Sequence, residues 1–378
     1  MQTFAEAFTK AERGKEIGPL DAAALLCAKH PEETRRLFEL ADAIRAEIKG
    51  QEATYVVNRN MNFTNICVGS CEFCGFSRKA GQAGAYFVSD EEIEKKLLEA
   101  KAYGATEVCI QGGLPPFITF DYYPNLLRQV KKIAPELHIH AYSCEEINYM
   151  TGLSGKTAAD VISILKDAGL GSTPGTAAEI LVERVREVIC PDKLSTERWV
   201  EIMQEVHRQG VPATSTIMFG HVEYPEEIGQ HLEVIRNIQK ETGGFTEFVP
   251  LPFIPYDNAL GRRYNIRKMI PNEEVFKLYA VSRIYFRETI PNIQSSWPKI
   301  GLEAAGEALR VGCNDVGGTL MEEKISNMSG SQWGDRATVE DLREIIVKNG
   351  RIPVERTTVY ERRESLDAAA PLSTNGFS

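Results

Sequence analysis

The feature that most constrains the fold is an alternation of short apolar segments with amphipathic helical segments, which begins near residue 55. Segments 157–168, 195–209 and 225–241 have apolar residues at helical spacing, and each stops shortly before a glycine. Strands are predicted between such helices, at 54–61, 107–111, 137–143, 170–173, 213–219, 245–251, 292–297 and 313–316. Eight strands with intervening helices favour an α/β fold of the (β/α)8 TIM-barrel type. An open doubly wound sheet is the alternative, since the fourth and eighth strands are weak.

The flanking segments differ from this pattern. Residues 1–50 read as an N-terminal helical extension, and residues 51–320 contain the predicted barrel. Residues 321–364 form a C-terminal extension, and the small, polar residues 365–378 are expected to be a disordered tail.

Charge and hydropathy exclude several function classes. The 378 residues include 43 Lys and Arg against 53 Asp and Glu, a net charge of −10. Nucleic acids and anionic membranes both favour a basic face, so a small-molecule ligand is predicted. The first residues lack the apolar core of a secretory signal, and no stretch reaches the ~18 apolar residues of a membrane span. A cytoplasmic location is therefore expected.

The strongest chemical motif is a cysteine cluster directly after the first predicted strand. Cys67, Cys71 and Cys74 lie within eight residues, on a loop that also contains Gly69 and Gly75. Three thiolates suit a [4Fe–4S] cluster that leaves one iron without a protein ligand. A zinc site would normally close with a fourth ligand, and none is near in sequence. A thioredoxin-type pair would leave Cys67 unexplained.

The pattern Cys-x3-Cys-x2-Cys, with Phe73 as the aromatic residue before the last cysteine, resembles the signature of the radical S-adenosylmethionine (SAM) superfamily. The resemblance implies that SAM binds the free iron through its amino and carboxylate groups. It also implies that a reduced cluster cleaves SAM to methionine and a 5′-deoxyadenosyl radical. The protein would then position this radical and exclude water.

Further segments resemble one group within this superfamily. They include 62–67, 110–114, 138–143, 174–180, 217–223, 247–253, 296–301, 312–322 and 356–360. The group contains the two FO synthase halves and the menaquinone futalosine-pathway enzymes, and the chain most resembles the FO synthase subunit 2 family. An enzyme similar to aminofutalosine synthase, from the menaquinone pathway, is the alternative.

The resemblance implies a transferase of coenzyme F420 biosynthesis. Its substrates would be L-tyrosine and 5-amino-6-(D-ribitylamino)uracil, and it would need an electron donor. Hydrogen abstraction from the tyrosine amino group would lead to Cα–Cβ cleavage. The resulting 4-hydroxybenzyl radical would add to C5 of the uracil, and the product would pass to the other FO synthase subunit.

Two stretches depart from the expected pattern. Gln111, Gly112 and Gly113 stand where the superfamily has Gly-Gly-Glu, which helps to hold SAM. The resemblance makes these three residues cofactor-binding candidates, and the two glycines either admit close approach of a ligand or form a plain turn. Residues 252–260, where substrate contacts are expected, match less clearly.

Other candidates follow predicted strands. Ser143 and Glu179 are predicted to bind SAM, although Glu179 could instead stabilise the start of a helix. His140, His221 and Glu223 are the catalytic candidates. His140 could equally be a satisfied core histidine.

The short eighth predicted strand supplies the last candidates. Asn314, Asp315 and Thr319 are predicted to contact substrate, or else to close the barrel.

Overall fold

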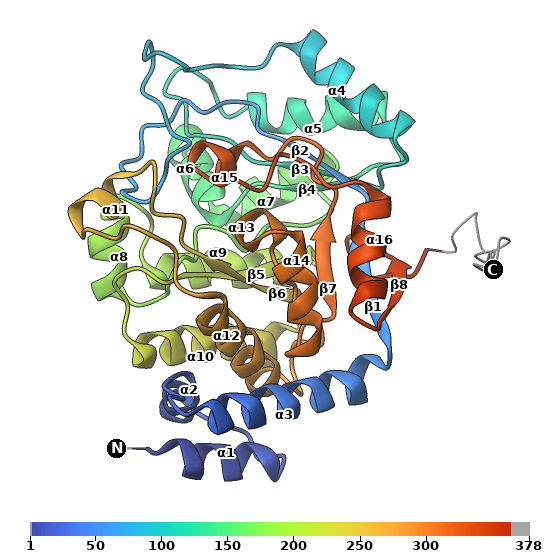
Figure 1. The fold of residues 1–378 in the computed structure, drawn as a ribbon. Helices are drawn as coiled ribbons and strands as arrows, with labels where there is room; N and C mark the ends of the chain where they lie inside the picture. Colours follow the sequence, from blue (N-terminus) through green and yellow to red (C-terminus); the bar gives the residue numbers. More distant parts are fainter. Residues whose placement is uncertain (1, 364–378) are drawn as a thin grey trace, which may run out of the picture.

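A computed structural model describes residues 2–363 of the chain, so the predicted tail at 365–378 lies outside the described residues. Its strands are all paired in parallel (Figure 1). They are β1 (Glu52–Val56), β2 (Asn58–Met61), β3 (Glu107–Ile110), β4 (His138–Ala141), β5 (Ala213–Phe219), β6 (Phe245–Pro252), β7 (Asp315–Gly318) and β8 (Ile352–Glu355).

The pairings among the described residues form a ring. β2 pairs with β3 and β3 with β4, then single bridges join β4 to Ser172 and Thr173 to β5. β5 pairs with β6, bridges connect β6 to Ile293 and Gln294 to β7, and β7 returns to β1. The ring excludes an open doubly wound sheet, and the predicted (β/α)8 class is confirmed.

Three strand predictions needed adjustment. The predicted strands at 170–173 and 292–297 contribute only isolated bridges, so they are shorter than the apolar pattern indicated. The predicted strand 54–61 is divided at Val57, because its first half pairs with β7 and β8 whereas its second half pairs with β3. β8 had no counterpart in the sequence prediction.

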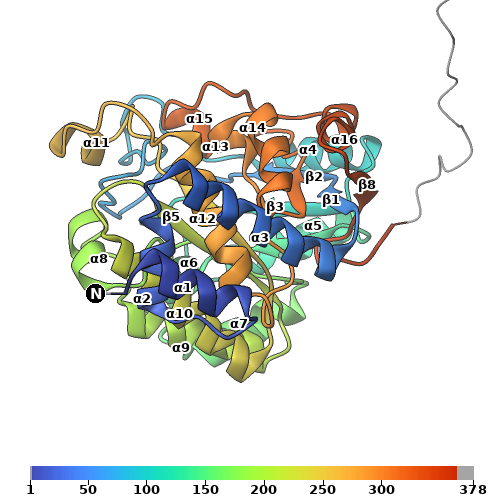
Figure 2. The ribbon, with the colours of Figure 1, turned by 60° about the horizontal axis from the view of Figure 1, so that its bottom comes forward.

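Helices surround the ring and cover its ends. Three N-terminal helices, of which α2 packs on α10 and α3 on α12, lie together at the bottom of Figure 1 and cross the front of Figure 2. The first half contains α1 (Phe4–Glu12), α2 (Pro19–Leu26), α3 (Pro31–Lys49), α4 (Asp90–Ala102), α5 (Tyr122–Ile133), α6 (Cys144–Ser154), α7 (Ala158–Asp167) and α8 (Glu183–Ile189). The second half contains α9 (Thr196–Arg208), α10 (Pro225–Thr242), α11 (Ala259–Arg263), α12 (Asn272–Tyr285), α13 (Trp297–Ile300), α14 (Leu302–Glu307), α15 (Lys324–Met328) and α16 (Val339–Lys348).

The helix ends follow the local sequence. Ser89 accepts a hydrogen bond from the Glu92 amide at the start of α4, and Gly104 follows that helix with φ +80°. Glycine adopts this left-handed conformation without the strain of a Cβ. None of the helices within residues 2–363 has the length and apolar character needed to cross a membrane.

The chain after residue 320 is interleaved with the barrel. Ile325 and Ser329, from α15 and its C-terminal end, line the same cavity as the cysteine loop, whereas β8 pairs with β1 at the opposite ends of the strands. α15 therefore contributes to the central site although it lies in the predicted C-terminal extension. The division into an extension at 1–50, a barrel at 51–320 and an extension at 321–364 stays a prediction from the sequence.

Candidate active site

The cysteine loop follows β2 and is folded by its own polar contacts. The Asn65 side chain donates to the Gly84 carbonyl at 2.9 Å and accepts from the Tyr86 amide at 2.9 Å. The Cys67 amide donates to the Arg78 carbonyl at 3.0 Å, and the Arg78 amide donates to the Asn65 carbonyl at 2.8 Å. The Gly69 amide also donates to the Cys67 sulfur at 3.3 Å, so most of the contacts that shape the loop do not involve the thiols.

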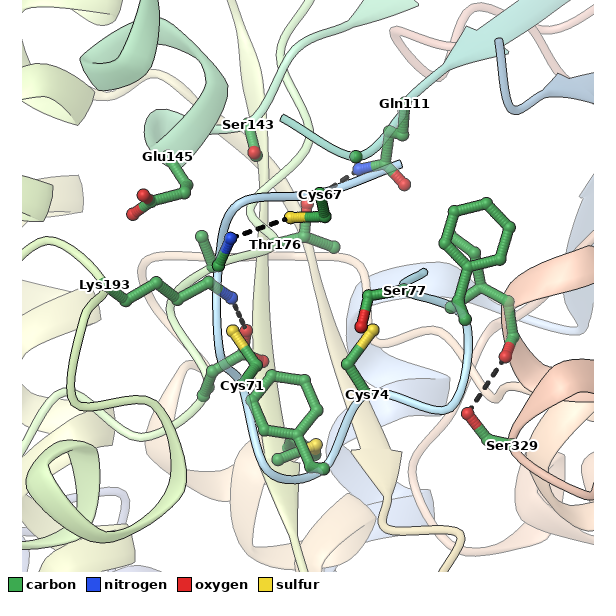
Figure 3. A pocket seen from close by; sticks show the side chains of 18 of the residues that line it. Cys67, Cys71, Cys74, Ser77, Gln111, Ser143, Glu145, Thr176, Lys193 and Ser329 are labelled. Atoms are coloured by element: carbon green, nitrogen blue, oxygen red, sulfur yellow. Dashed lines mark hydrogen bonds and ion pairs between the residues drawn. The ribbon is translucent and has the colours of Figure 1, made fainter. Parts of the chain in front are cut away.

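All three cysteines line a cavity of about 250 Å³ at the C-terminal ends of the barrel strands. Figure 3 shows their sulfur atoms around a common space on the inner side of the loop. No three potential ligand side chains among residues 2–363 converge closely enough for a single metal ion, whereas a [4Fe–4S] cubane binds three thiolates through three separate irons. The donor set therefore fits the cluster predicted from Cys67, Cys71 and Cys74.

The surroundings of Cys71 combine burial with a cation. Burial raises the pKa of the Cys71 thiol to about 12, and the Lys193 ammonium opposes that rise. Lys193 also lies 5.1 Å from the centre of the Phe73 ring, which lines the same cavity. A positive group beside the loop favours the thiolate form that binds iron.

Gly112 and Gly113 follow β3 and line the cavity. A Cβ on Gly112 would lie 2.5 Å from the Phe63 ring, and one on Gly113 would lie 2.3 Å from the Ile66 carbonyl oxygen. The glycines therefore allow the backbone after β3 to approach the start of the cysteine loop. The close approach that the structure shows is to the chain itself, and the approach of a ligand at these glycines stays a prediction.

Replacing Gly113 with alanine is expected to displace Ile66 and with it Cys67, because a backbone carbonyl cannot move aside as a flexible side chain can. Bound iron per chain, measured after anaerobic reconstitution, should fall severalfold relative to the parent protein. Gly152→Ala is the matched control, since nothing lies within 4 Å of its added Cβ and Gly152 has ordinary helical backbone within α6. Equal iron content in the Gly113 and Gly152 variants would contradict this account.

Polar groups bind the neighbouring loops together. Gln111 donates to the Thr176 hydroxyl at 2.7 Å, and both residues line the cavity (Figure 3). Ser143, the N-cap of α6, accepts from the Glu146 amide while the Glu146 carboxylate accepts from the Ser143 amide at 2.7 Å. Glu146 also accepts from the Gly112 amide at 3.1 Å. Burial raises the pKa of Glu146 to about 7, against the effect of these hydrogen bonds.

The predicted helix start at Glu179 is wrong. Glu179 lies in a loop with φ +46°, four residues before α8, so no helix dipole acts on it there. Its carboxylate instead accepts from the Lys193 ammonium at 2.5 Å. The pair lines the cavity beside Cys71, which places Glu179 where a ligand of this cavity would contact it.

His140 faces a second cavity, of about 190 Å³, inside the barrel. Its Nδ1 lies 2.6 Å from the Ser172 hydroxyl, and burial lowers its pKa to about 4 despite the Glu107 carboxylate. A neutral imidazole with a hydrogen-bond partner is what the core-histidine alternative predicts for His140. His140 nevertheless lines this cavity, where a ligand could contact it. Gln111 and Thr176 line both cavities and therefore lie at their boundary.

The structure places His221 and Glu223 in the loop after β5, away from both cavities. The His221 Nε2 lies 2.9 Å from the Met218 carbonyl oxygen. Although burial disfavours its charge, hydrogen bonds from His221 and the Gly220 amide lower the pKa of Glu223 to about 2. Both side chains fix the loop, and their predicted catalytic role gains no support from their positions.

The predicted substrate residues in and next to β7 have other partners. Asn314 accepts from the Arg283 guanidinium at 2.6 Å, and Asp315 accepts from Arg356 at 2.5 Å. Thr319 donates to the Asn58 carbonyl at 2.7 Å. None of the three lines either cavity, so the barrel-closing alternative describes their positions.

Sequence reasoning missed several residues of the main cavity. They are Glu145, Glu146, Thr176, Lys193 and Lys299. Position after a strand could have indicated Thr176, which follows the predicted strand at 170–173. Lys193 lies in the connection between α8 and α9, and nothing in its local sequence indicates the site.

Comparisons with known proteins agree with this geometry. The family model described as the radical SAM superfamily matches residues 61–235, and the one described as the CofH/MqnC C-terminal region matches residues 242–369. Among solved structures, methylornithine synthase has a TM-score of 0.72 at 17% identity, covering 92% of this chain and 97% of that chain. The [FeFe]-hydrogenase maturase from Carboxydothermus hydrogenoformans has a TM-score of 0.74 at 16% identity, covering 94% and 80%. These structures support the fold alone.

Curated relatives are much more similar in sequence. A Methanosarcina barkeri protein named 5-amino-6-(D-ribitylamino)uracil–L-tyrosine 4-hydroxyphenyl transferase 1 is 47% identical over 337 residues, 89% of each chain. A Methanopyrus kandleri protein named as the same transferase is 45% identical over 326 residues, 86% of this chain and 88% of the relative. The chain therefore belongs to the radical SAM superfamily and, within it, to the 5-amino-6-(D-ribitylamino)uracil–L-tyrosine 4-hydroxyphenyl transferase family, subunit 2 of FO synthase.

Proposed function

We propose that the protein transfers the 4-hydroxybenzyl group of L-tyrosine to 5-amino-6-(D-ribitylamino)uracil, a step of coenzyme F420 biosynthesis. The relatives at 43–48% identity carry this activity in their names, which favours it over the menaquinone-pathway alternative. The single observation that carries the chemistry is the cavity that contains Cys67, Cys71 and Cys74. When bound there, a reduced [4Fe–4S] cluster supplies the electron that cleaves SAM and generates a 5′-deoxyadenosyl radical.

The residues that would hold SAM follow β3, β4 and the bridge at 172–173. The Gln111 side chain and the Gly113 backbone lie next to the cysteine loop, and Ser143 and Glu179 continue the same wall of the cavity. The Glu179–Lys193 ion pair holds the Glu179 carboxylate in place. Ordered polar groups on one wall can fix a cofactor relative to the three thiolates while the barrel excludes water.

The acceptor is proposed to enter the second cavity, inside the barrel. TIM-barrel interiors are usually filled by bulky branched apolar side chains, whereas this one is lined by many polar groups. They include Asn58, Asn60, Glu107, Glu247, Gln294 and Arg356. A uracil with a ribityl chain presents amide, amine and hydroxyl groups that suit such a lining. The boundary residues Gln111 and Thr176 would then separate the acceptor from SAM.

The proposal also includes the protein's partners and its location in the cell. An electron donor must supply the cluster, and the product would pass to the other FO synthase subunit for closure of the deazaflavin ring. We propose a cytoplasmic location, supported by eight free cysteines and by a site chemistry that requires reduced thiols.

A product assay tests the proposed function. Reconstituted and reduced enzyme, given SAM, L-tyrosine and the ribitylaminouracil, should yield one adduct that mass spectrometry identifies by the added hydroxybenzyl mass. Omitting the uracil should remove the adduct, because the acceptor is then absent. Enzyme that forms 5′-deoxyadenosine without consuming tyrosine would refute the substrate assignment while leaving the radical SAM chemistry intact.

A further inference from the structure

Lys299 is a cation without a partner at the main cavity. It lies in α13 and lines the cavity together with the three cysteines. Its ammonium makes no hydrogen bond or ion pair with any residue between 2 and 363, and burial lowers its pKa. Desolvation of a charge is costly unless a counter-charge compensates it, so this side chain favours an anionic ligand.

The nearby carboxylates already have other partners. Glu179 accepts from Lys193 at 2.5 Å. Glu323 accepts from the Asn60 amide group and from the Ser326 backbone amide, each at 2.7 Å. The chain therefore leaves the Lys299 charge available to a molecule in the cavity.

The backbone beneath Lys299 is firmly held. Trp297, which is buried, donates from its indole to the Gly318 carbonyl at 2.9 Å, and the Ser331 hydroxyl donates to the Pro298 carbonyl at 2.7 Å. The Lys299 amide donates to the Ser296 carbonyl at 3.0 Å. A fixed backbone limits the region that the Lys299 ammonium can reach, which reduces the entropic cost of binding.

Lys299 and the SAM-binding candidates follow different members of the barrel ring. The SAM-binding candidates follow the second, third and fourth members of the ring, whereas α13 follows the seventh, at 293–294. Between them the cavity is lined by apolar side chains from the ends of β5 and β6, including Met218, Leu251 and Phe253. A substrate with an apolar ring and a carboxylate could place the ring on these side chains and the carboxylate on Lys299.

We propose that Lys299 binds the carboxylate of the amino-acid substrate, L-tyrosine, and determines the enzyme's specificity for an α-amino acid at this position. This inference rests on the proposed function. SAM also has a carboxylate, but Lys299 follows the ring member at 293–294, next to the apolar lining from β5 and β6, which assigns this cation to tyrosine. Separate titrations of L-tyrosine and SAM distinguish the two sources.

The test is calorimetric titration of oxidised holoenzyme, which binds ligands but does not turn over. Lys299→Met should weaken L-tyrosine binding about 10- to 100-fold through loss of a charge-assisted hydrogen bond, and leave SAM binding within about twofold. Lys299→Arg should recover part of the affinity. Lys95→Met, at a lysine whose side chain is 76% exposed, is the control and should leave both affinities unchanged.

Tyrosinamide, which lacks the carboxylate charge, provides an arm that needs no variant. The parent enzyme should bind it much more weakly than L-tyrosine, and Lys299→Met should bind the two almost equally. Weakened SAM binding, or unchanged tyrosine discrimination, would overturn the proposal for Lys299. Complete absence of tyrosine binding by the parent enzyme would overturn the proposed function as well, which distinguishes the two failures.

Discussion

Replacing Cys71 with alanine is expected to give a folded protein that binds no [4Fe–4S] cluster and forms no detectable 5′-deoxyadenosine. The Cys71 side chain is half-buried at the cavity, and the loop around it is held by contacts of Asn65 and Arg78 in which the Cys71 thiol takes no part. Loss of one of three thiolates removes an iron ligand, and two remaining thiolates are not expected to hold a cubane cluster. The fold should persist because the barrel core does not depend on the metal.

The measurements are iron content, visible absorption after anaerobic reconstitution, and the thermal unfolding midpoint of the unreconstituted protein. Parent protein should be brown, with about four irons per chain, as expected for one cubane cluster. Cys313→Ala is the control, since Cys313 is buried away from the cavity and should leave the iron content unchanged. Full iron occupancy in Cys71→Ala would contradict the ligand assignment, and loss of its fold would indicate a structural metal.

The sequence predicts those parts of the site whose residues lie close together along the chain. Cys67, Cys71 and Cys74 need only one loop to converge, and Gly112 and Gly113 mark a close approach wherever they occur in a βα turn. The barrel was predictable for the same reason, since helix and strand periods are local properties.

Pairing between distant segments was not predictable in this way. Glu179 was expected at a helix start, yet its conformation and its partner Lys193 depend on a loop that the barrel shapes. His221 and Glu223 have the composition of a catalytic pair, and only their contacts show that they fix a loop. Lys299 is an ordinary lysine in sequence, because the absence of a counter-charge is a property of the folded cavity.

A large loss of stability is expected from a substitution at the end of the barrel opposite the cysteine loop. Arg356 follows β8 and donates to Asp315 at 2.5 and 3.1 Å, while Tyr360 donates to Glu247 beside it. Arg356, Asp315 and Glu247 are buried and Tyr360 is half-buried. Arg356 and Glu247 also line the barrel cavity. Arg356→Met should destabilise the protein by about 3–5 kcal/mol, because it leaves the Asp315 carboxylate buried without its cation.

Denaturant unfolding of the unreconstituted protein measures this loss. Arg363→Met is the matched control, because Arg363 pairs with Glu355 at the surface and a surface pair contributes about 0–1 kcal/mol. Adding Asp315→Asn to Arg356→Met should recover part of the stability by removing the unpaired charge. Equal stability of the Arg356 and Arg363 variants would refute the buried-pair account.

The double variant also separates packing from ligand recognition. If the polar lining of the barrel cavity serves the uracil acceptor, stability regained through Asp315→Asn should not restore the acceptor's KM, because the Arg356 guanidinium is still missing from that lining. Recovery of both would mean that Arg356 acts only by closing the barrel. In that case the segment after β8 would influence catalysis only by holding the strands in place, and the acceptor would be recognised by other groups of the cavity.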